Sequence, residues 1–179
     1  MKILSGLDGC EQAIIELVTA TFAASEGADE GALIGEVVRD LLADTAQTDI
    51  HVFRAEIEGH VVGVAIITRL TYPDDPRHVV LLSPMAVATG HQRQGIGQAQ
   101  LVHALAALRS ERAEVALTYG DPDYYRQVGF APITEDQARA PLPLSFPHGW
   151  LGQSLTEDVM PTIRGSSVCA SALNRVDVW

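Results

Sequence analysis

Hydrophobic and polar positions follow a helical period over the first quarter of the chain. From about Glu11 to Asp44, apolar residues recur every three to four positions, which predicts two amphipathic helices. The polar, glycine-containing segment Ser25–Gly31 is expected to form the loop between them. The apolar face of the first helix comprises Ile14, Leu17, Val18 and Phe22, and that of the second Ile34, Val37, Val38, Leu41 and Leu42.

Several short apolar segments predict strands. His51–Ile57 and Val61–Leu70 are joined by Glu58-Gly59-His60 and are expected to pair as an antiparallel hairpin. Shorter strands are expected at residues 2–5, at Ala113–Thr118 and at Trp150–Thr156.

Val79–Val87 is an apolar run bounded by turn residues and broken only by Ser83, the pattern of a buried strand, and Thr89-Gly90 ends it. Proline has no N–H to donate to a ladder, so Pro84 predicts a bulge or splay within this strand. The next helix follows at once, with apolar residues at Leu101, Val102, Leu105 and Leu108.

The order of elements is strand–helix–helix–strand–strand–strand–helix–strand–helix–strand, which predicts a mixed α/β sheet. A chain of 179 residues suits one domain, 1–179, with its core at about 1–158 and a C-terminal extension at 159–179. Beyond Ala131 the pattern is interrupted by Pro132, Pro141, Pro143 and Pro147, and no further long helix is expected.

Gln92–Gly97 lies between the buried strand and the helix and has the composition of an anion site. Gly95 and Gly97 remove side chains where the free N–H groups of a helix start point outward. The positive end of the helix dipole and Arg93 add attraction for phosphate or pyrophosphate. The segment lacks the third glycine of the dinucleotide fingerprint and the Gly-Lys-Ser/Thr of a Walker loop.

The string Gln/Arg-x-x-Gly-x-Gly/Ala, after a strand ending in Ala-Val and before an apolar helix, resembles motif A of the GNAT acetyltransferases. The resemblance implies a mostly antiparallel sheet splayed at its fourth strand, with helices on both faces. It also implies that acetyl-CoA lays its pyrophosphate on the loop and its pantetheine arm along the strand end. The residues so implied are Met85, Ala86, Val87, Gln92, Arg93, Gln94, Gly95, Ile96, Gly97 and Gln98.

A second stretch resembles the same family. Asp121 and Pro122 predict the capped start of a short helix over Asp123–Val128. Tyr-x-x-x-Gly-Phe then places Tyr125 where GNAT enzymes commonly have a tyrosine that acts as general acid toward the CoA sulfur. The fuller string Gly-Asp-Pro-x-Tyr-Tyr-x-x-x-Gly-Phe is similar to the YhbS-like branch of the family. The alternative for Tyr125 is a packing role, and Tyr124 ranks second as the acid.

The general base is not assigned by the sequence. Family members often use a carboxylate on the strand before the phosphate loop, and here that region offers only His78 and Ser83 as polar positions. His78 is a candidate because histidine titrates near neutral pH. Asp74 and Asp75 lie in a turn and are expected at the surface. Contacts to the acceptor are expected from Ser25–Gly31 and from the segment after Phe130.

Composition narrows the class of partner. The net charge of −11 argues against nucleic acid, charged tRNA included, and weakly favours a cationic substrate. The two cysteines, Cys10 and Cys169, match no metal spacing and suggest a reducing compartment. Neither a signal peptide nor a membrane-spanning run is visible, so a cytoplasmic protein is expected. Because no ligand spacing is found, no metal is expected. The family resemblance also allows a homodimer.

The sequence therefore predicts an acetyl-CoA-dependent N-acetyltransferase that moves an acetyl group to a primary amine of a small molecule or peptide by direct attack. Two alternatives stay open. One is a non-catalytic acyl-CoA-binding or regulatory module, which the missing carboxylate favours. The other is an acyltransferase for a longer acyl chain.

Overall fold

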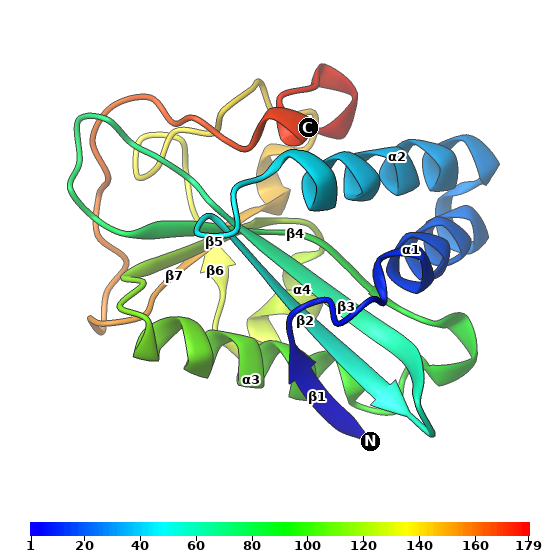
Figure 1. Cartoon of the computed structure of the whole chain (residues 1–179). Helices are drawn as coiled ribbons and strands as arrows, with labels where there is room; N and C mark the ends of the chain where they lie inside the picture. The colour runs from blue at the N-terminus through cyan, green and yellow to red at the C-terminus, as the bar shows by residue number, and fades with distance from the viewer. The chain divides into compact units, whose positions relative to one another are not determined.

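The computed structural model describes residues 1–179 and contains a seven-stranded sheet with the strand order β1-β2-β3-β4-β5-β7-β6 (Figure 1). β4 and β5 pair in parallel, whereas β1–β2, β5–β7 and β6–β7 pair antiparallel. The mixed α/β fold class is therefore confirmed. The strands are β1 (Lys2–Ser5), β2 (Ile50–Ile57), β3 (His60–Arg69), β4 (Val79–Val87), β5 (Val115–Tyr119), β6 (Ala131–Pro132) and β7 (Trp150–Ser154).

Four α-helices accompany the strands: α1 (Glu11–Glu26), α2 (Ala28–Asp44), α3 (Ile96–Ser110) and α4 (Pro122–Tyr125). The chain forms two compact units, one of residues 1–67 and 84–104 and the other of residues 68–83 and 105–179. β3 and β4 each contribute residues to both units. The organisation as one domain with a C-terminal extension stays a prediction.

In the first unit, α1 and α2 pack side by side (Figure 1). The expected loop over Ser25–Gly31 is wrong, because only Gly27 separates the two helices. Gly27 takes a φ of 105°, a value that favours glycine, and its N–H still bonds the Ala23 carbonyl. The polar residues of this segment thus lie on helix ends.

Glycines in α2 allow the close approach of the two helices. A Cβ built on Gly31 would lie 2.6 Å from the Thr19 carbonyl oxygen and from the Ala23 Cβ. A Cβ on Gly35 would overlap the Thr19 hydroxyl. Gly31 is therefore a helix-packing residue, and the turn suggested by its residue type is not formed there.

Successive side chains of β2 point to opposite faces of the sheet and have different partners. The buried Arg54 bonds Asp8, Glu56 and the Gly6 carbonyl, and so ties β2 to the segment after β1. Phe53 instead faces α3, where its ring meets His103 edge to face. The turn after β2 has positive φ at Glu58 (52°) and Gly59 (81°), as two-residue hairpin turns require.

The second unit contains β5, β7 and the short edge strand β6, which the sequence pattern did not reveal. β5 lies between β4 and β7, and its ladder with β4 runs from Val79↔Val115 to Leu82↔Thr118. The C-terminal segment adds to this core, since the Trp179 ring is buried and stacks on Tyr119 at a centroid distance of 5.8 Å. Its indole N–H donates to the Leu173 carbonyl.

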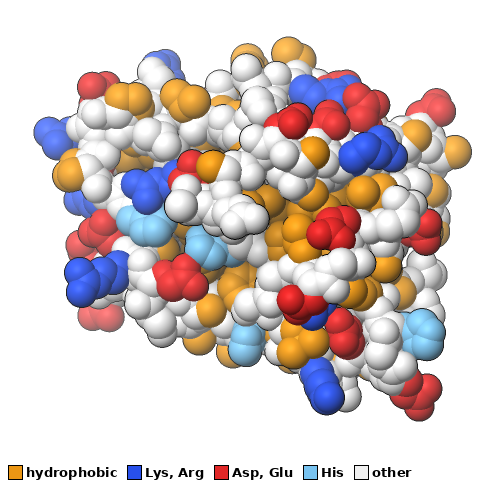
Figure 2. Space-filling view, in the orientation of Figure 1, with side chains coloured by type: hydrophobic (Ala, Val, Ile, Leu, Met, Phe, Trp, Pro, Cys, Tyr) orange, Lys and Arg blue, Asp and Glu red, His pale blue; other side chains and the backbone are white.

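Charge, thiols and helix length were the features that the composition addressed. Figure 2 shows separated Lys and Arg side chains and no continuous basic patch on the face in view. Cys10 and Cys169 are both free. None of the helices is both long enough and apolar enough to cross a bilayer.

Candidate functional site

The segment between β4 and α3 turns sharply before the helix begins. Thr89–His91 forms a single 3₁₀ turn, and Arg93 (φ 58°) and Gly95 (φ 78°) are left-handed. A left-handed arginine is uncommon, because the Cβ of an L-residue crowds the backbone there. The two left-handed residues aim the chain into α3.

Backbone donors are concentrated where α3 begins. Ala99 N–H bonds the Gly95 carbonyl at 3.0 Å, the first i to i−4 bond of the helix. The first N–H groups of an α-helix have no acceptor four residues before them, and they carry the positive end of its dipole. Residues 92–95 are exposed, whereas Ile96 and Gly97 are buried. The exposed residues before the helix and its positive end are features that favour an anion.

The same segment is anchored to the strands beneath it. Ile96 is buried against Ala55 and Val62, which belong to β2 and β3. The Gln100 side chain is fully buried and donates to the Phe53 carbonyl at 2.7 Å. The first turns of α3 are thus held to the sheet by apolar packing and a buried hydrogen bond.

Two glutamines brace the loop internally. Gln92 Nε2 donates to the Val87 carbonyl at 3.0 Å, and Gln94 Nε2 donates to the Gly90 carbonyl at 3.3 Å. At the strand end, Ala86 is buried, whereas Met85 and Val87 are half-buried. The predicted acetyl-CoA residues therefore share one unit, from the end of β4 through the loop to the start of α3.

Tyr125 lies in the other unit, on the capped helix α4. Asp121 Oδ1 accepts the Asp123 N–H at 2.9 Å and Pro122 occupies the first helical position, as the sequence predicts. The helix is shorter than expected, because residues 126–128 continue it as a 3₁₀ turn.

The Tyr125 ring is enclosed by the motif that contains it. Phe130 and Tyr124 meet the ring edge to face at centroid distances of 5.7 and 5.1 Å. A Cβ on Gly120 would lie 2.8 Å from Tyr125 Cε2. Gly129 is left-handed (φ 98°) and turns the chain so that Phe130 returns to the ring. These contacts explain both glycines of the second motif.

Burial raises the pKa of Tyr125 to about 12, and the side chain of Thr118, a fully buried residue of β5, partly opposes that rise. The neighbouring Tyr124 and Asp121 add to it. The sequence analysis missed Thr118; its signal was a hydroxyl at the end of an apolar strand, next to the Tyr-Gly-Asp-Pro turn.

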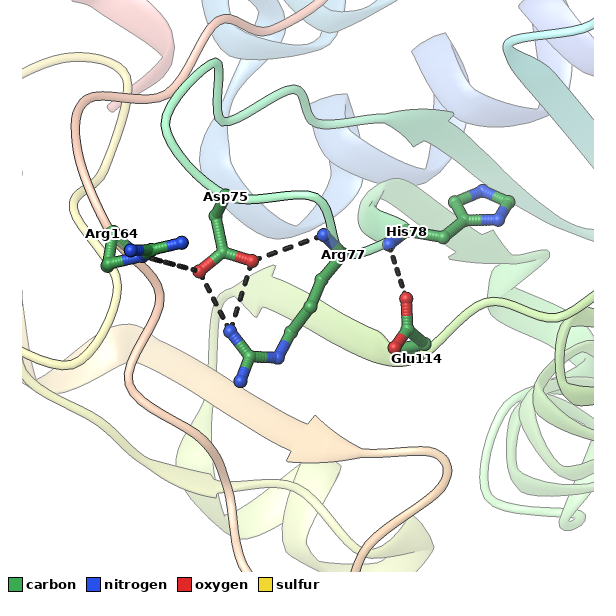
Figure 3. A network of polar contacts seen from close by, with 5 residues as sticks. All are labelled: Asp75, Arg77, His78, Glu114 and Arg164. Carbon is green, nitrogen blue, oxygen red and sulfur yellow. Dashed lines mark hydrogen bonds and ion pairs between the residues drawn. The ribbon is translucent and has the colours of Figure 1, made fainter.

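The expectation that Asp75 lies at the surface is wrong. Its carboxylate is buried and accepts the backbone N–H groups of Arg77 and Arg164 at 3.1 Å each (Figure 3). The Arg77 guanidinium bonds both carboxylate oxygens, at 3.0 and 2.8 Å. Burial alone would raise the pKa of Asp75, but these hydrogen bonds and the Arg77 charge outweigh it and lower the pKa. A carboxylate so paired is a poor proton acceptor.

His78 stands at the start of β4 with its backbone bound to Glu114. Its N–H donates to Glu114 Oε2 at 2.8 Å, and its carbonyl accepts the Glu114 N–H at 2.8 Å. In Figure 3 the imidazole of His78 points away from Asp75 and its arginines. Asp74 is exposed, as expected.

Glu26 and Glu30 belong to Ser25–Gly31, the segment expected to contact the acceptor, and they lie at the junction of α1 and α2. Partial burial, together with the Glu30 charge, raises the pKa of Glu26. No group of three or more His, Cys, Asp or Glu side chains gathers as a metal site.

Residues 48–132 match the acetyltransferase (GNAT) domain model. Across most of its length the chain is similar to a curated N-acetyltransferase, and it belongs to the GNAT family of N-acetyltransferases. That relative is the uncharacterized N-acetyltransferase YjhQ of Escherichia coli K12, 31% identical over 162 residues, which cover 88% of this chain and 85% of YjhQ.

Solved structures of the family share the fold. The chain is similar to E. coli YhbS in complex with CoA, with a TM-score of 0.82, 20% identity and coverage of 98% and 92% of the two chains. It is also similar to a GNAT acetyltransferase of Brucella melitensis in complex with acetyl-CoA, with a TM-score of 0.75, 22% identity and coverage of 96% and 97%. The GNAT fold predicted from motif A is therefore confirmed.

Proposed function

We propose that this N-acetyltransferase takes its acetyl group from acetyl-CoA and transfers it to a primary amine. The observation that carries the proposal is the loop Gln92–Gly97. The exposed residues 92–95, with the charge of Arg93 among them, lie there at the positive end of α3. The YhbS and Brucella structures, which hold CoA and acetyl-CoA, support the same donor.

In this proposal the loop amides and Arg93 hold the pyrophosphate, and the pantetheine arm runs along Met85, Ala86 and Val87 as an added strand. Gln92 and Gln94 keep the loop in shape through the hydrogen bonds that they donate to its backbone. Ile96, Gly97 and Gln98 supply the first-turn amides.

The chemical step is direct attack of a neutral amine on the thioester carbonyl. A C–N bond forms, the C–S bond breaks, and the nitrogen loses a proton while the sulfur gains one. Tyr125 supplies the proton to the sulfur, since a tyrosine phenol is protonated at neutral pH and can donate. Asp75 is not the base, since Arg77 and Arg164 engage its carboxylate. The amine arrives neutral or loses its proton to water.

Calorimetric titration with acetyl-CoA, CoA and a long-chain acyl-CoA tests the donor. Micromolar binding of acetyl-CoA, with no gain from the longer chain, supports the proposal. Tighter binding of the long-chain compound indicates an acyltransferase for longer chains. No binding of any of the three contradicts the donor assignment. A thiol-release screen over polyamines and lysine peptides then seeks the acceptor.

The catalytic role is tested with Tyr125→Phe. General acid catalysis contributes roughly 100-fold or more, so turnover should fall by about that factor while acetyl-CoA affinity changes little. Tyr124→Phe, which removes the neighbouring hydroxyl, is the control and should keep the wild-type rate. An unchanged rate in Tyr125→Phe returns this residue to a packing role. Binding without thiol release from any amine points to the non-catalytic module.

A further inference from the structure

Gly120, against which the Tyr125 ring packs, belongs to a closed circuit of hydrogen bonds in the second unit. Its N–H donates to the Gly149 carbonyl at 2.9 Å, and the Gly149 N–H donates to the Phe146 carbonyl at 2.8 Å. The Phe146 N–H in turn donates to the Tyr119 hydroxyl at 2.6 Å, and Tyr119 directly precedes Gly120 in the chain. These bonds form the Tyr119 circuit, which comprises residues 119, 120, 146 and 149.

The turn in this circuit, residues 145–149, is not held in place by burial. Residues 145–148 are exposed, and Phe146 is 52% exposed. Gly149 lets the turn approach β5, because a Cβ on Gly149 would lie 2.9 Å from the Gly120 carbonyl oxygen. The Tyr119 hydroxyl holds the other end of the turn, since it also hydrogen-bonds Ser145 Oγ at 3.1 Å. The position of the turn therefore depends on the Tyr119 side chain.

The Tyr119 ring is itself held by the C-terminal segment. The buried Trp179 ring stacks on it at a centroid distance of 5.8 Å and an interplanar angle of 19°. Trp150 meets the Trp179 ring edge to face at 5.9 Å, and the Trp179 indole N–H donates to the Leu173 carbonyl at 2.7 Å. Because these contacts fix Trp179, the stacked Tyr119 ring keeps its hydroxyl at the Phe146 N–H.

Gly120 is the point at which the circuit meets Tyr125. A Cβ on Gly120 would lie 2.8 Å from Tyr125 Cε2 and 3.8 Å from Cζ, so the Gly120 backbone packs against one edge of the ring. The next residue, Asp121, accepts the Tyr125 backbone N–H at 3.1 Å and begins α4. A shift of Gly120 therefore moves both the wall beside the ring and the start of its helix. A proton donor must lie within hydrogen-bond reach of the atom that it serves, so a small shift of this kind lowers the rate.

Resting on the proposed acid role of Tyr125, we propose that Tyr119 is the positioning residue of Tyr125. The Tyr119 hydroxyl holds the 145–149 turn, the turn holds Gly120, and Gly120 sets the direction of the Tyr125 ring. Trp179 keeps the Tyr119 ring in the orientation that the circuit requires. Tyr119 itself exchanges no proton in the reaction and acts only through Gly120. The C-terminal segment is thereby coupled to the general acid.

The direct test follows the ring of residue 125 and requires no acceptor amine. Fluorotyrosine is placed at position 125 alone, and its fluorine resonance reports the surroundings of the ring. Tyr119→Phe keeps the stacked ring but removes the hydroxyl, so the resonance should shift and broaden as Gly120 loosens. Trp179→Leu should act in the same direction. Trp179→Phe, which keeps a flat ring, should restore most of the wild-type signal.

Tyr72→Phe is the matched control. Tyr72 lies in the same unit, and its hydroxyl also bonds a backbone group, the Arg139 carbonyl, at 2.8 Å. That carbonyl keeps a second donor in the variant, the Ser167 hydroxyl at 2.8 Å, so the resonance of residue 125 should not change. An unchanged resonance in Tyr119→Phe or Trp179→Leu, or an equal change in Tyr72→Phe, overturns the proposal. Melting curves verify folding, and Tyr119→Phe alone decides if Trp179→Leu does not fold.

A rate measurement separates this proposal from the acid role on which it rests. Thiol release from acetyl-CoA is followed with water as the acceptor. Tyr119→Phe should slow it about tenfold, with a KM for acetyl-CoA within about twofold of wild type, because a misplaced donor lowers turnover and leaves binding intact. It should have no effect in the Tyr125→Phe background. If Tyr125→Phe is fully active, the acid role fails. If Tyr125→Phe is slow and Tyr119→Phe is fully active, the positioning role fails and the acid role stands.

Discussion

Two loops flank β4, and they use their polar groups in opposite ways. In the loop before the strand, Leu70–His78, the buried Asp75 takes up two backbone amides and a guanidinium, and the Tyr72 hydroxyl donates to the Arg139 carbonyl. In the loop after the strand, Ala88–Gly95, the side chains of residues 92–94 are exposed. Gln92 and Gln94 donate to the nearby carbonyls of Val87 and Gly90.

We expect the loop before β4 to contribute to the stability of the fold and the loop after β4 to contribute to ligand binding. A loop whose polar groups are bonded internally resists opening, whereas exposed donors on a firmly anchored loop are available to a ligand. Substitutions before β4 should therefore change the free energy of unfolding, and substitutions after β4 should change affinity for acetyl-CoA.

The largest effect is expected from Gly97→Trp, which fills the start of α3. Acetyl-CoA affinity should fall more than about a hundredfold, or roughly 2.7 kcal/mol, because the side chain covers the amides. Calorimetry measures the loss, and a melting curve verifies folding. Val102→Trp, at an exposed position of the same helix, is the control and should bind normally. Wild-type affinity in Gly97→Trp would exclude the pyrophosphate from this loop.

Asp75→Asn should have the next largest effect, on stability. The amide carries no charge for Arg77 and presents an NH₂ group to donors, so the free energy of unfolding should fall by roughly 2–3 kcal/mol. Chemical denaturation measures it, with the exposed neighbour Asp74→Asn expected within about 0.5 kcal/mol of wild type. Acetyl-CoA affinity of the folded protein should not change. A large loss of affinity would show that the loop before β4 also contributes to binding.

Acid should weaken the same loop. The lowered pKa of Asp75 gives stability that is fully present above its unfolded pKa, about 3.9, and is lost as the pH falls through the folded value. The stability difference between wild type and Asp75→Asn should therefore shrink below about pH 4. Denaturation curves at pH 7 and at several acidic pH values check this. A constant difference would assign the cost of the substitution to packing.

The smallest effect is expected from Arg93→Gln. Loss of one exposed charge should weaken acetyl-CoA binding by about threefold to tenfold, and less at high salt. Arg112→Gln is a close control, since Arg112 is also exposed and also left-handed, at φ 66°. Equal effects of the two substitutions would mean that net charge, not the loop, determines the change.

Elements fixed by local pattern were predicted well, and those fixed by distant contacts were not. Strand β4, helix α3 and the capped start of α4 follow from residues within a few positions of one another. Gly31 misled the prediction because its packing against Thr19 belongs to a neighbouring helix. Val102 was expected on the apolar face of α3 but is exposed. The spacing of apolar residues therefore predicted a wider buried face than the helix has.

The candidate site shows the same division. Arg93, Gly95 and Gly97 lie within five positions of the chain, so motif A can be recognised from the sequence alone. The partners of Asp75 include Arg164, 89 positions away, and no local pattern could show that this carboxylate is buried. Thr118 and Leu82 are 36 positions apart, so the hydrogen bond that the Thr118 hydroxyl donates to the Leu82 carbonyl follows only from the pairing of β4 and β5.

The crossing of α1 and α2 has an evolutionary consequence. Gly35 has no room for a Cβ because the Thr19 hydroxyl occupies that space. A larger residue at position 35 therefore becomes acceptable only after position 19 has lost its branch, to alanine or glycine. In descendants of this chain the two positions should change together and in that order, so the packing of this pair constrains which mutational routes remain open.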